Sequence, residues 1–162
     1  MAELTTLEEK LAEVTGLAKA AQEATQKVEG LVDDDDLASK LQQMRQEAEE
    51  TERRCTEVAD NRDGKKTAIL DKAQETRNEA AEMMSTYLAA DSDDLDGFEF
   101  LTMAEAGEVG HWEILGKLNE RAGEAELEEL VEWALPIQER HFSGVKDCSL
   151  KLAGKKDPYE EA

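Results

Sequence analysis

Apolar residues recur every three or four positions along most of this chain, which is the spacing of one face of an α-helix. The Thr-Thr-Leu-Glu sequence at residues 5–8 predicts a capping box at the start of a first helix, over residues 4–29. The acidic run of residues 33–36 favours the start of a second helix ending near Asp60, because a helix N-terminus stabilises negative charge. The same periodicity predicts three further helices, over residues 65–90, 95–121 and 124–153.

These five segments predict an all-α protein in which helices joined by short connections pack antiparallel as a bundle. Residues 1–153 are expected to form a single domain, and residues 154–162 a polar C-terminal tail. The two cysteines, Cys55 and Cys148, fall on apolar seams of different helices and lack the close spacing of a zinc or redox site. Both are therefore expected to be small buried core residues.

Two polar pairs interrupt the apolar seams of the last two predicted helices. Glu108 and His111 occupy seam positions in the fourth helix, and Gln138 and His141 do so in the fifth. Both pairs lie at similar distances in sequence from the connection at Gly123. An antiparallel hairpin therefore brings the two pairs to the same height, facing each other in the core.

A buried carboxylate is costly unless a cation or hydrogen bonds compensate its charge. Two imidazoles and one carboxylate are a familiar ligand set for iron, manganese or zinc. The pattern therefore predicts a transition metal ion as cofactor, with Glu108, His111 and His141 as ligands. Gln138 is a further ligand or a hydrogen-bond partner, and Glu105 flanks this face and either adds a ligand or faces solvent. The competing interpretation is a hydrogen-bonded polar layer that fixes the register of the bundle and binds no metal.

Forty acidic residues against nineteen lysines and arginines give a formal net charge of -21. This charge repels phosphate backbones and anionic membranes, so nucleic acid and membrane surfaces are not expected partners. No run of about 18 apolar residues occurs, and residues 1–6 lack a basic or an apolar region, which predicts a cytoplasmic protein. Apolar positions in segment 65–90 cover either the protein's own core or a second copy, so a homodimer is a candidate assembly.

The sequence EAGEVGHWEIL at residues 105–115, followed by ALPIQERHF at residues 134–142, resembles the last two core helices of ferritin-like proteins. The similarity is greatest to small bacterial stress-associated ferritin-like domains, and it is clear over residues 95–150. The resemblance implies a ferritin-like four-helix bundle in which residues 61–93 form an additional helical crossover segment. It also implies a di-iron site, with one Glu from each of two helices and one Glu-x-x-His from each of the others. A role in metal handling or oxidative stress would follow.

Glu108 and His111 match one of these motifs residue for residue, whereas Gln138 and His141 match the other with Gln in place of Glu. The first two helices offer no carboxylate on their seams. Their nearest acidic residues require a rotation of about 100° to reach the core: Glu9, Glu23, Glu49, Glu50 and Glu52. Three possibilities stay open. They are a mononuclear site of His111, His141 and Glu108, a di-iron site that borrows these glutamates, and a relict site that binds nothing.

Overall fold

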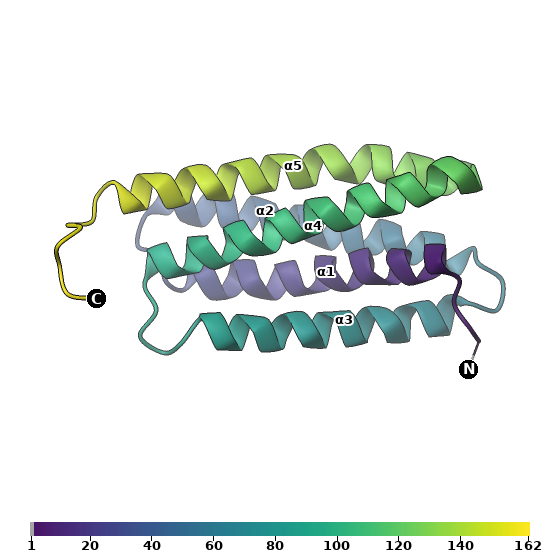
Figure 1. Ribbon diagram of the computed structural model, residues 1–162, viewed down its shortest axis with the longest axis horizontal. Coiled ribbons are helices and arrows are strands. Elements are labelled where there is room, and N and C mark those ends of the chain that lie inside the picture. The colour runs from purple at the N-terminus through teal and green to yellow at the C-terminus, as the bar shows by residue number, and fades with distance from the viewer. Residues whose placement is uncertain (1) are drawn as a thin grey trace.

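The computed structural model of the protein describes residues 2–162, and within this range it has five α-helices and no strand (Figure 1). In chain order the helices are α1 (Thr6–Glu29), α2 (Asp35–Asp60), α3 (Lys66–Tyr87), α4 (Asp94–Ala122) and α5 (Ala125–Ala153). The all-α class predicted from the sequence is confirmed. Within the described range, no helix combines the length and the apolar character that a membrane crossing requires.

Local hydrogen bonds from capping side chains explain where α1, α2 and α4 begin. The backbone N–H of Glu8 donates to Thr5 Oγ1 at 3.2 Å, and the N–H of Thr5 donates to Glu8 Oε2 at 2.8 Å. This is the capping box that the sequence predicts. Asp34 caps α2, and Asp93 caps α4 in a second capping box. Gly123 then ends α4 with φ 67°, a left-handed conformation that glycine adopts without strain.

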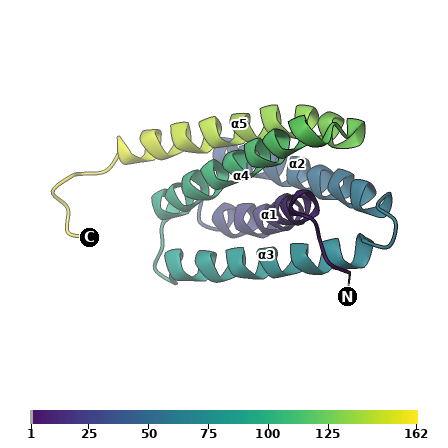
Figure 2. The ribbon, with the colours of Figure 1, turned by 45° about the vertical axis from the view of Figure 1, so that its right-hand side comes forward.

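Four of the helices surround a common core. α1 packs on α2, α2 on α5, α5 on α4, and α4 on α1, and each runs antiparallel to its two neighbours (Figure 1). We call this arrangement the four-helix core. α3 lies outside it, mainly against α1, and runs along the bundle between the end of α2 and the start of α4 (Figure 2). α1 is therefore enclosed on three sides.

The contact between α1 and α3 depends on a glycine. A Cβ atom at Gly16 would lie 2.7 Å from the Cβ of Thr76 and closer still to the carbonyl oxygen of Ala73. Real Cβ atoms do not approach other atoms so closely. Any side chain at this position would push the two helices apart.

Apolar side chains form two separate clusters along the bundle. The first contains buried residues from all five helices, including Leu11, Cys55, Ile69, Trp112, Leu115 and Leu127. The second includes Val28, Leu41, Phe98, Leu101, Val145 and Cys148. Both cysteines are buried and free, as the sequence predicts.

At each end of the bundle, ion pairs link segments that are far apart in the sequence. At one end Arg62, which follows α2, lies 3.2 Å from Glu8 Oε1 and 2.7 Å from Glu124 Oε2. It thereby links the start of α1 to the connection between α4 and α5. At the other end Lys156 Nζ donates to Asp93 Oδ2 at 2.7 Å, which ties the exposed segment 154–162 to the start of α4.

Candidate functional site

Four polar side chains lie between the two apolar clusters, and we call them the polar layer: Glu105 and Glu108 on α4, and Gln138 and His141 on α5. All four are at most 4% exposed. In the corresponding interval α1 and α2 present small buried residues, among them Ala18, Ala21, Ala48 and Thr51. The polar layer is thus a band of polar side chains in an otherwise apolar interior, bordered by small side chains.

The amide of Gln138 connects the two carboxyl groups. With its nitrogen turned toward them, Nε2 donates to Glu105 Oε2 at 3.0 Å and to Glu108 Oε2 at 3.0 Å. In this orientation the amide nitrogen donates to both carboxyl groups, whereas the opposite one directs the amide oxygen at carboxyl oxygens. Gln138 is therefore a bridge between Glu105 and Glu108.

Burial makes the charged forms of both carboxyl groups unfavourable. It raises the pKa of Glu105 to about 8. It also raises the pKa of Glu108 well above the usual range for a glutamate, and the negative charge of Glu105 adds to this effect. The pair therefore retains protons at a pH where exposed glutamates are ionised.

His141 is oriented by a carboxylate of α2. Its Nε2 is hydrogen-bonded to Glu47 Oε1 at 3.2 Å, while its Nδ1 lies 3.8 Å from Glu105 Oε2. Arg140 also donates to Glu47, at 2.9 Å from Nη1. Burial lowers the pKa of His141, although Glu47 acts in the opposite direction. A neutral imidazole that donates from Nε2 to Glu47 leaves the lone pair of Nδ1 directed at Glu105.

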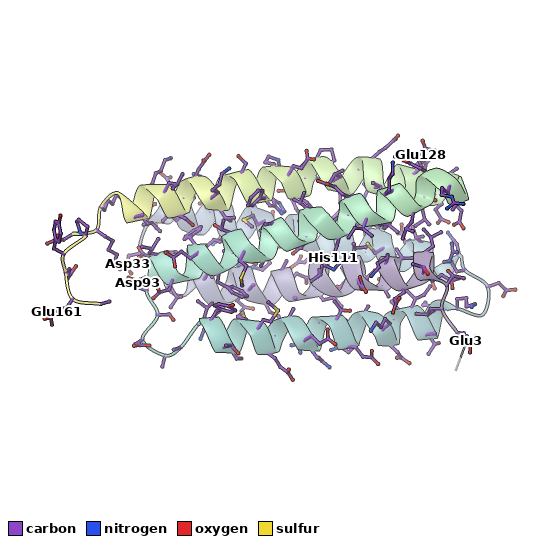
Figure 3. The ribbon with its side chains drawn as sticks, in the orientation of Figure 1. Glu3, Asp33, Asp93, His111, Glu128 and Glu161 are labelled. Carbon is purple, nitrogen blue, oxygen red and sulfur yellow. The ribbon has the colours of Figure 1, made fainter. Side chains whose placement is uncertain are left out.

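His111 is not part of the polar layer. The sequence predicted it on the buried seam of the fourth helix, as a metal ligand, and the structure places it elsewhere. Its side chain is 40% exposed, and its Nε2 lies 3.6 Å from Glu13 Oε2 of α1. Figure 3 shows it beside α1, where its Nδ1 is also 2.8 Å from the carbonyl oxygen of Gly107. The neighbouring Trp112 is fully buried instead. Burying the larger indole removes more apolar surface from water, so α4 is turned to place Trp112 and Glu105 inside.

Glu47 contacts His141 of the polar layer but was not predicted from the sequence to do so. It lies three residues after Met44 and four before Thr51, both of which are buried seam residues of α2. That spacing places it on the same helix face and is the signal that identifies it. The other glutamates considered have different contacts: Glu23 pairs with Arg77, Glu50 with Arg53 and Arg54, and Glu52 with Gln22, while Glu9 is half-buried and Glu49 exposed.

The donor types of the polar layer suit a transition metal, but the side chains are not gathered around one point. Within residues 2–162, no group of three or more His, Cys, Asp or Glu side chains is arranged to hold a metal ion. The closest approach between an imidazole and a carboxylate in the layer is the 3.8 Å between His141 and Glu105. Two ligand atoms bound to one metal at about 2.1 Å lie about 3 to 4 Å apart, so this pair fits a shared ion.

No protein-family model matches the chain, and no curated protein matches it.

Proposed function

We propose that the protein is a ferritin-like bundle that binds one transition metal ion, iron, manganese or zinc, at the polar layer. Glu105, Glu108 and His141 are the proposed protein ligands, and Gln138 is a neutral ligand or a hydrogen-bond partner. The ferritin-like part of the proposal is supported by α3, which runs along the four-helix core like the long crossover of that superfamily. A role in metal handling or in the response to oxidative stress would follow from such a site.

One observation carries the metal proposal. Glu105 and Glu108 are one helical turn apart and almost fully buried, and in the described chain neither forms an ion pair with a lysine or arginine. Isolated buried carboxylates are strongly unfavourable, and a metal ion would supply the missing positive charge. The metal would in turn supply Lewis-acid or redox chemistry. The chain's own contribution is to exclude water and, through Glu47, to orient the ring of His141.

The test is direct titration of chelator-treated protein with Fe²⁺, Mn²⁺ and Zn²⁺ without oxygen, followed by calorimetry and by thermal unfolding. We expect close to one equivalent of one of these ions to bind and to raise the unfolding temperature, because a ligand that binds only the folded state stabilises it. Binding is expected to release protons, since the carboxyl groups of the polar layer must ionise to act as ligands.

Three variants make the test specific. Glu108→Gln is expected to weaken binding at least about tenfold, because it replaces a charged ligand with a neutral amide. Glu113→Gln, at an exposed position of the same helix, is the matched control and should leave binding unchanged. His111→Ala should also leave it unchanged, since His111 lies against Glu13. Binding of less than about a tenth of an equivalent of every metal would rule out the proposal.

A second candidate function is favoured by the two hydrogen bonds of Gln138. If both carboxyl groups stay protonated, they carry no charge that a metal must neutralise, and the hydrogen bonds from Gln138 set the register of α4 against α5. In that case the protein is a non-catalytic helical interaction protein. Glu105→Gln combined with Glu108→Gln would then alter the melting behaviour or the oligomeric state, while chelator and added metals would alter neither.

A further inference from the structure

An apolar cleft leads from the surface to the polar layer. It has a volume of about 190 Å³ and lies between α1, α3 and α4. Alanines and methionines form much of its wall, including Ala21, Ala80, Met83, Met84, Met103 and Ala104. Glu105 and Glu108 also line it, so the cleft reaches the buried carboxyl groups. Met83 is 50% exposed and Met103 39% exposed, which places them at its mouth.

We propose that this cleft binds a small, neutral, apolar molecule of about the size of a monosubstituted benzene. The proposal goes beyond the metal site, because it rests on the walls of the cleft and not on a bound metal. The size of the cleft supports the proposal, since an enclosed apolar cavity of about 150 Å³ is large enough to bind benzene. An apolar molecule in this cleft would cover the alanine and methionine side chains of its wall and remove their apolar surface from water.

The side chains of the wall suit an occupant of variable shape. Three methionines contribute to it, and their flexible, polarisable thioethers adapt to ligands and make favourable contacts with aromatic rings. The alanines of α1 and α3 leave the space that larger side chains would fill. Phe100 provides one aromatic wall from α4. A molecule with a single ring is therefore expected to fit the cleft better than an extended aliphatic molecule.

The cleft offers no strong cationic partner to an anion. Among the described residues that line it there is no lysine or arginine, and its histidine, His111, already lies 3.6 Å from Glu13. The whole chain also carries a net charge of -21. Carboxylate ligands such as fatty acids would meet repulsion without a compensating cation. An organic ammonium group would have to lose its hydration in a cleft whose wall is mostly alanine and methionine, which is costly.

Methionine methyl groups give a direct readout of occupancy. In protein labelled with [¹³C]methyl-methionine, we expect toluene to shift the signals of Met83, Met84 and Met103 in a saturable manner. Met44 is the internal control, because it is buried in the second apolar cluster and does not line the cleft. Benzylamine and benzoate, which have nearly the same shape, are expected to bind more weakly than toluene. Tighter binding of either charged compound would overturn the assignment of a neutral ligand.

Two alanine substitutions on α4 complete the experiment. Ala104→Leu fills the cleft and is expected to weaken toluene binding at least about tenfold. Ala106→Leu adds the same side chain at an exposed position outside the cleft and should leave binding unchanged. If Ala104→Leu does not fold, Ala80→Leu tests the α3 wall instead.

Two results would overturn the proposal. One is toluene binding that neither cleft-filling variant weakens. The other is a dependence of the Met83 and Met103 signals on protein concentration without toluene, which would show that a second copy of the chain covers the cleft. All titrations are made with chelator present, so their outcome is independent of whether the polar layer binds a metal.

Discussion

The buried carboxyl groups of Glu105 and Glu108 make a specific prediction about the stability of the metal-free protein. In the unfolded chain a glutamate titrates near its ordinary pKa of 4.5, whereas in the folded protein the pKa of Glu105 is raised to about 8. Between these values the folded state holds a proton that the unfolded state has lost. The free energy of unfolding therefore falls as the pH rises through this window, and the contribution is complete only below the unfolded pKa.

The size of the effect follows from the proton count. One proton held only by the folded state changes the free energy of unfolding by about 1.4 kcal/mol per pH unit at most. Between pH 5 and pH 7 one carboxyl group would thus contribute a loss of roughly 2 to 3 kcal/mol, and the pair up to roughly twice that. A small domain has about 5 to 15 kcal/mol of total stability, so a change of this size is readily measured.

The assay compares the wild-type protein with a Glu105→Gln/Glu108→Gln variant by urea unfolding, followed by circular dichroism, in chelator from about pH 5 to about pH 8. The difference between the two curves isolates the pair. Other groups with shifted pKa values, such as Glu8 and Glu47 with lowered values, are present in both proteins and cancel. We expect the wild-type protein to lose at least about 2 kcal/mol relative to the variant between pH 5 and pH 7.

A flat difference would refute the reasoning. If the two proteins differ by the same amount within about 0.5 kcal/mol over the whole pH range, the carboxyl groups do not hold extra protons in the folded state. The free-energy cost of burying the ionised carboxyl groups would then be offset by other interactions in the folded protein. A difference that rises with pH would have the same meaning, because it would require lowered pKa values.

Three further predictions concern the packing and the ion pairs. Gly16→Ala should destabilise the protein by about 1 to 3 kcal/mol in urea unfolding, since its Cβ meets Thr76. The control is Gly144→Ala, whose added Cβ would meet no atom within 4 Å and which should raise the free energy of unfolding by about 0.5 to 1 kcal/mol. The same change in stability for both variants would contradict the close approach of α1 and α3 at Gly16. Arg62→Gln should cost about 1 to 3 kcal/mol in the same assay, because it leaves the buried carboxylate of Glu8 with fewer partners; no loss would contradict this role. Glu47→Gln should lower the pKa of His141 further in an NMR titration, because Glu47 raises it; an unchanged pKa would contradict the contact.

The positions of the helices were predictable because their signals are local. Capping residues such as Thr5 and Asp93 act on the backbone within one turn, and Gly123 is suited to the left-handed conformation that ends α4. The same holds for the seam of α5, where the predicted burial of Gln138 and His141 is confirmed. Caps and helical periodicity depend on residues that are close together in the sequence, so they can be recognised without knowing how the helices pack.

The rotation of α4 was not predictable in the same way. Its sequence allows two apolar faces about 100° apart, one with His111 inside and one with Trp112 inside. The choice between them depends on how much surface each buries against α1 and α5, which is a property of the packed bundle. The role of Glu47 was hidden for the same reason, since its contact with His141 joins residues 94 positions apart.

The outer position of α3 has a consequence for access to the interior. Its buried residues, Ala68, Ile69 and Ala73, all lie in its first half, and its start lacks a side-chain cap. The second half, which carries Met83 and Met84, is held by fewer buried groups, so local opening is expected to cost less there than in the first half. Such openings would widen the cleft between α1, α3 and α4 and speed the exchange of small molecules with its interior.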